Sequence, residues 1–203
     1  MKKFLTLAAC CLGLSPLTSF AEDSNRLADI GLERRIAALS PAAQENAFEI
    51  GMLQTLRAIE KTLQTRYEYG LGESLVDLPV LRLQFSGLSH PQPKTAGPDT
   101  LSNIVSTLIS DLRQAQSSLT NGGANGPQAF ELTLQDLWFD IDSNGQRAAK
   151  ESAASILAPV ILGQRAMRDP DTAALLEVPI AIRFDAADHD WLLAYTHLLS
   201  GFG

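Results

Sequence analysis

Apolar residues recur every three or four positions along most of the chain, which is the spacing of one face of an α-helix. The clearest stripe comprises Phe48, Met52, Leu56, Ile59, Leu63 and Tyr67. Similar spacing predicts helices over residues 24–38, 100–119, 129–139 and 150–166, and a last helix capped by Asp185 or Asp188. The pattern is typical of a mostly α-helical fold.

Two short segments are candidates for extended structure. Pro79–Phe85 and Pro179–Phe184 are faintly alike, and two strands formed there would pair with each other. Stretches rich in proline, glycine and asparagine at 87–98 and 120–127 separate the helical segments and indicate surface loops. The expected fold class is therefore mostly α: an irregular helical domain with up to two short β-strands.

Residues 1–21 have the pattern of a secretory signal peptide. Two lysines precede a long apolar run, and small residues stand at the two positions that a signal peptidase reads, so we expect cleavage after Ala21. A single mature domain then covers 22–203. The alternative is a buried first helix, which the abrupt start of charged residues at Glu22 disfavours.

Both cysteines of the chain, Cys10 and Cys11, lie inside this leader. Leu7–Cys10 resembles a bacterial lipoprotein cleavage box, but the apolar run before it is short, so a lipid anchor through Cys10 is the second interpretation. A mature chain without cysteine has no disulfide, no thiolate nucleophile and no zinc–thiolate site. We expect a periplasmic or secreted protein.

Charge and motifs exclude several classes of function. The formal net charge of −7 disfavours nucleic-acid binding, because an acidic surface repels phosphate backbones. No segment after the leader approaches the roughly 20 unbroken apolar residues of a transmembrane helix. The chain has no G-x-S-x-G, G-x-G-x-x-G, P-loop or H-E-x-x-H motif. His189 and His197 lie near several aspartates, where capping and a solvated helix face are more typical than a metal site.

Residues 140–151 match the calcium loop of an EF-hand, D-x-D-x-N-G-x5-E, at every fixed position. Calcium takes about six to eight oxygen ligands. The expected ligands are the side chains of Asp140, Asp142, Asn144 and Glu151 and the backbone carbonyl of Gln146. Gly145 stands where the loop turns sharply. Helices over 129–139 and 150–166 would complete a helix–loop–helix.

Two features of the loop limit its role. Arg147 stands at the eighth position of the loop, where paired EF-hands usually have an aliphatic residue that contacts a second loop, the sister loop. The chain has no second loop, so a paired, cooperative sensor is disfavoured. Ala148 offers no side-chain ligand, which predicts a water there and an affinity of about 10⁻⁴–10⁻³ M. The alternative to binding is that Asp142 or Asn144 merely caps the following helix.

Several stretches resemble an uncharacterised family of bacterial signal-peptide-bearing proteins with an EF-hand-like calcium loop. They are Arg66–Leu71, Leu78–Leu83, the loop itself, Arg183–Asp188, and Trp191-Leu192 with Tyr195 and His197–Leu199. The resemblance implies no activity. It implies that the native protein continues past Gly203, and Arg147 departs from the family's loop.

These observations favour an exported calcium-binding protein whose single loop braces the fold. One alternative is a calcium-ordered module that binds a protein partner, which an exposed apolar patch near Trp138 would favour. A second alternative is an envelope enzyme with an unrecognised site, marked by a pocket that gathers His189 or His197 with carboxylates. Both tryptophans, Trp138 and Trp191, are expected in the core.

Overall fold

The computed structural model describes residues 26–73, 75, 79–85, 87–121, 128–161, 163 and 178–201. Its helices are α1 (Leu27–Leu39), α2 (Ala47–Glu68), α3 (Thr100–Thr120), α4 (Ala153–Ile161) and α6 (Ala186–Ser200). Its strands are β1 (Phe130–Thr133) and β2 (Ala181–Phe184), and short 3-10 turns lie at Ser40–Ala42, Leu134–Asp136 and Ala149–Glu151. The mostly helical fold with two short strands is confirmed. The leader predicted over 1–21 lies outside the described residues.

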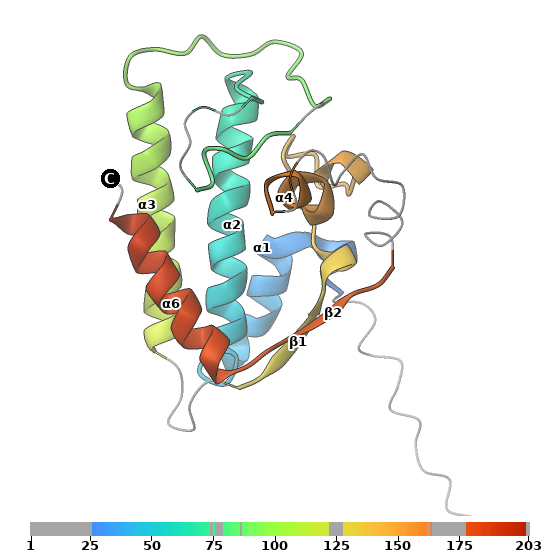
Figure 1. The fold of residues 1–203 in the computed structure, drawn as a ribbon, viewed down its shortest axis with the longest axis vertical. Helices are drawn as coiled ribbons and strands as arrows, with labels where there is room; N and C mark the ends of the chain where they lie inside the picture. Colours follow the sequence, from blue (N-terminus) through green and yellow to red (C-terminus); the bar gives the residue numbers. More distant parts are fainter. Residues whose placement is uncertain are drawn as a thin grey trace, which may run out of the picture.

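The long helices α2 and α3 run side by side, and α6 crosses α3 (Figure 1). Their contact is close because α2 carries a glycine where α3 approaches it: a Cβ on Gly51 would lie 2.5 Å from Leu119 Cγ. Leu53, Leu63 and Leu112 are fully buried in these helices. None of the helices in the described part of the chain is both long and apolar enough to cross a membrane.

Helix α1 is kinked at Gly31, whose φ of 74° lies in the left-handed region. A side chain there would meet the ring of Trp138, whose Cζ2 lies 3.3 Å from the place of a Cβ. The indole Nε1 donates a hydrogen bond to the Leu27 carbonyl at 3.3 Å. The kink therefore seats Trp138, two residues before the acidic loop, against α1.

The antiparallel ribbon corrects two predictions. Strand β2 pairs with β1, with Phe130 opposite Phe184, and not with Pro79–Phe85. The two phenyl rings stack with centroids 5.1 Å apart, a cross-strand contact that stabilises the pair. The prediction of a helix over 129–139 is thus wrong. The spacing of its apolar residues fits the period of a helix and that of a strand, and the pairing with β2 favours the strand.

The segment predicted as a strand at Pro79–Phe85 is a series of turns. Val80 has a φ of 69°, and the N–H groups of Leu81 and Leu83 bond to Pro79 and Val80 within the segment. Its apolar side chains are buried, so it packs as a turn on the core.

Helix α6 buries a narrower face than its sequence predicts. Leu192, Thr196 and Leu199 face inward, whereas Trp191 is 63% exposed and Leu198 is 58% exposed. The prediction that Trp191 lies in the core is wrong, because the helix presents its opposite side to α3. Tyr195 stacks on Trp191 at the surface, with ring centroids 5.0 Å apart.

The main core holds the acidic loop in place. It gathers buried side chains from the helices and from both ends of the loop: Leu32, Leu53, Leu63, Leu137, Phe139, Ile141 and Ile156. Phe139 and Ile141 are both fully buried. Asp140 therefore lies between two anchored neighbours, which fixes its backbone relative to α2.

Candidate metal centre

The two ends of the loop at 140–151 are tied together by backbone hydrogen bonds. The N–H of Phe139 donates to the Glu151 carbonyl at 2.8 Å, and the N–H of Ala153 donates to the Leu137 carbonyl at 3.0 Å. Trp138 and Ser152 form an isolated antiparallel bridge there. A helix follows the loop, α4, but an extended segment and a 3-10 turn precede it. The predicted helix–loop–helix therefore lacks its first helix.

The loop curls around its own carboxylates through local hydrogen bonds. Gly145, with a φ of 71°, donates its N–H to both Asp140 carboxylate oxygens at 3.2 and 3.1 Å. The N–H of Asn144 donates to Asp142 Oδ1 at 3.1 Å, and the N–H of Gln146 donates to Asn144 Oδ1 at 2.6 Å. In the last two bonds a side chain accepts from the backbone N–H two residues ahead, which is typical of Asx turns.

Three of the predicted ligands meet in space. Asp140, Asp142 and Glu151 each offer a carboxylate oxygen, and these oxygens lie within 4.8 Å of one another. Asn144 joins the group through its amide, since Nδ2 donates to Asp142 Oδ2 at 2.8 Å. Gln146 joins through its N–H, and the predicted role of its carbonyl stays a prediction.

Glu151 is the buried member of the cluster. Its side chain is fully buried, and Oε1 accepts hydrogen bonds from the N–H groups of Ile141 at 2.8 Å and Asp142 at 3.3 Å. Its other oxygen, Oε2, has no hydrogen-bond partner among the described residues. Burial raises the pKa of Glu151, the Asp142 and Asp140 carboxylates raise it further, and the two backbone N–H groups oppose the shift.

The donor set fits a hard cation. An unpartnered buried oxygen costs about 1–3 kcal/mol, and more when it is charged. A cation between Asp140, Asp142 and Glu151 would satisfy that oxygen and remove the repulsion between three carboxylates. The ligands on offer are carboxylate, amide and carbonyl oxygens, which suit calcium or magnesium rather than softer metals.

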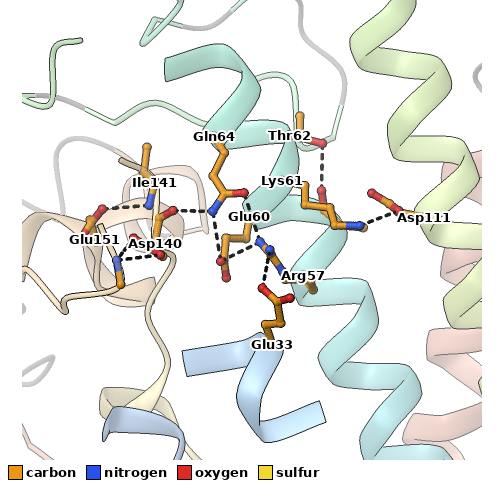
Figure 2. Close-up of polar contacts among 12 residues, drawn as sticks. Glu33, Arg57, Glu60, Lys61, Thr62, Gln64, Asp111, Asp140, Ile141 and Glu151 are labelled. Atoms are coloured by element: carbon orange, nitrogen blue, oxygen red, sulfur yellow. Dashed lines mark hydrogen bonds and ion pairs between the residues drawn. The ribbon is translucent and has the colours of Figure 1, made fainter. Parts of the chain in front are cut away.

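Helix α2 supplies a polar network beside the loop, which Figure 2 shows. Gln64 Nε2 donates to the Asp140 carbonyl at 2.6 Å. Arg57 Nη1 donates to Glu60 Oε1 at 2.9 Å, and Glu60 is only 4% exposed. Burial raises the pKa of Glu60 to about 7, with the Asp140 and Glu33 carboxylates adding to the rise and Arg57 opposing it.

The sequence gives little sign of this network. Arg57, Glu60 and Gln64 are spaced for one face of α2, but spacing alone does not show what a face contacts. Gln64 lies 76 residues before Asp140, so only the tertiary fold brings them together.

A small cleft opens beside the loop, between α1, α2 and the loop itself. Its volume is about 150 Å³. It is lined by residues that include Glu33, Arg57, Glu60, Trp138 and Asp140. The first residue of the loop therefore borders a cleft lined by charged side chains.

His189, predicted to lie on the polar side of the last helix, is partly buried. Its Nε2 lies 3.0 Å from the Leu119 carbonyl and its Nδ1 lies 3.0 Å from Asp190 Oδ1. Its ring meets Phe48 edge-on, with centroids 5.2 Å apart. These contacts fix the start of α6 on α2 and α3, which is a structural role.

Fold and site together describe a mostly helical protein with an acidic loop suited to a hard cation. Comparison with family models, with curated proteins and with solved structures found no match to the chain. The resemblance to a bacterial signal-peptide-bearing family therefore stays a prediction.

Proposed function

We propose that this chain is an exported calcium-binding protein in which the loop at 140–151 braces the fold. The observation that carries the proposal is the fully buried Glu151, whose Oε2 lacks a partner and whose carboxylate lies with those of Asp140 and Asp142. The complete loop motif makes calcium the favoured cation. The leader-like residues 1–21 support export.

Calcium braces the fold because the residues that hold it come from both ends of the loop. Asp140 and Asp142 lie at its start and Glu151 at its end, and the bridge between Trp138 and Ser152 closes it. An ion that binds only this folded arrangement stabilises it by RT ln(1 + [Ca]/Kd), about 0.4–1.4 kcal/mol at about 1 mM calcium for a Kd of about 10⁻⁴–10⁻³ M. A weak site is thus sufficient outside the cytoplasm, where calcium is plentiful.

Among the described residues, Trp138 itself does not supply the exposed surface that a calcium-ordered interaction module would use. That alternative called for an exposed apolar patch near Trp138, but Trp138 is 3% exposed and its indole is bonded to α1. Stabilisation of the fold by calcium is therefore the function that we propose.

Thermal unfolding with calcium, magnesium or a chelator tests the proposal, on the wild type, on Glu151→Gln and on Glu45→Gln as an exposed control with the same charge change. Calcium is expected to raise the Tm of the wild type and of Glu45→Gln, and to leave Glu151→Gln near its chelator value. The same calcium shift in Glu151→Gln would place the ion elsewhere. No shift in any of the three would overturn the structural role of calcium.

A further inference from the structure

The loop lacks both supports that an EF-hand loop usually has. The segment before it is extended, and the sequence over residues 1–203 has no second match to the loop motif. The face of α2 that carries Gln64 lies in contact with the loop, where a missing first helix would otherwise support it (Figure 2).

Gln64 is held in one orientation by its neighbours. Arg57 Nη1 donates to Gln64 Oε1 at 3.1 Å, and since a guanidinium has only donors, the amide oxygen must face Arg57. The amide nitrogen then points to the Asp140 carbonyl at 2.6 Å, with Glu60 Oε1 3.5 Å away on its other side. Arg57 is itself fixed to α1, because Nη2 donates to Glu33 Oε2 at 3.1 Å.

We propose that Gln64 is the positioning residue of the calcium loop: its amide holds the Asp140 carbonyl, and so the first ligand of the loop, at the place where the loop binds the ion. The inference rests on the proposed function. It assigns to α2 the part that the first helix and the sister loop take in an ordinary EF-hand. Residues that orient a ligand typically contribute about 10- to 100-fold to metal affinity.

The test replaces Gln64 by methionine, which keeps the length of the side chain and removes the donor. Gln54→Met is the matched control, because Gln54 lies on the same helix, is half-buried like Gln64, and has an Oε1 without a partner. Calcium affinity is measured by titration calorimetry on the full mature chain. Urea unfolding in chelator measures the fold without the ion.

We expect Gln64→Met to raise the Kd for calcium about tenfold or more, and Gln54→Met to leave it within about twofold. Urea unfolding in chelator defines conditions under which both variants are fully folded, and under those conditions a merely structural role of Gln64 would leave the Kd for calcium unchanged. Gln64→Asn keeps the amide but is one methylene too short to reach Asp140, and it should lose affinity to the same extent. This second variant keeps the test valid if Gln64→Met does not fold.

Wild-type calcium affinity in whichever Gln64 variants fold would overturn the positioning role while leaving the calcium site intact. A wild type that binds no calcium would overturn the proposed function, and the positioning role with it. The two failures are therefore distinct.

Discussion

Glu60 should make the stability of the calcium-free protein fall as pH rises. Its carboxyl is 4% exposed, Oε1 accepts from Arg57, and Oε2 has no partner among the described residues. Burial raises its pKa from 4.5 to about 7 in the folded protein. The unfolded chain, whose Glu60 is solvated, keeps the ordinary value.

The sign follows from which state holds the proton. Between about pH 4.5 and 7 the folded protein keeps a proton on Glu60 that the unfolded chain has lost, so stability falls with rising pH. The stabilisation is fully present below about pH 4.5 and is lost as pH rises through about 7. At about 1.4 kcal/mol for each pKa unit, the change over this window is about 3 kcal/mol.

Urea unfolding followed by circular dichroism, in chelator at several pH values, measures this effect. The raised pKa of Glu151 acts in the same direction, so the wild-type profile alone does not isolate Glu60. Glu60→Gln does, because glutamine does not ionise. The difference in unfolding free energy between the two proteins should shift by about 3 kcal/mol in favour of the variant between about pH 4.5 and 8. A difference that stays constant over this range would refute the reasoning.

Two further predictions concern packing. Gly51→Ala should destabilise the fold by about 1–3 kcal/mol, because the new methyl group meets Leu119 at 2.5 Å. In a double-mutant cycle, the variant with both Gly51→Ala and Leu119→Ala should lose less unfolding free energy than the sum of the two single losses. Trp191 is 63% exposed and Trp138 is 3% exposed, so Trp191→Phe should shift fluorescence to shorter wavelength and protect it from acrylamide, whereas Trp138→Phe should do the reverse. Equal quenching of the two variants would contradict the assigned burial.

The loop was predictable because its chemistry is local. The carboxylates of Asp140, Asp142 and Glu151 lie within twelve consecutive positions, and the turn at Gly145 lies between the first two and the last. The spacing of the motif therefore predicts that these three carboxylates lie close together. The long helices were predictable for the same reason, since their apolar stripes repeat over many turns.

What the sequence did not predict depends on distant contacts. Phe130 begins a segment whose spacing suits a helix, and only Phe184, 54 positions later, makes it a strand. Gln64 sits on a helix face like any other polar residue until the fold brings Asp140 to it. Trp191 is exposed because α6 packs on α3 with its other face. Helix α6 has two apolar sides, and the periodicity of the sequence does not show which of them is buried.

The backbone bridge at the neck of the loop has a mechanical consequence. A calcium sensor works by leverage: binding swings the helix before the loop against the helix after it and uncovers a groove. Here the segment before the loop is extended and tied to the segment after it through Trp138 and Ser152. An ion bound by this loop has no preceding helix to move. The free energy of its binding would therefore stabilise the conformation that the chain already has.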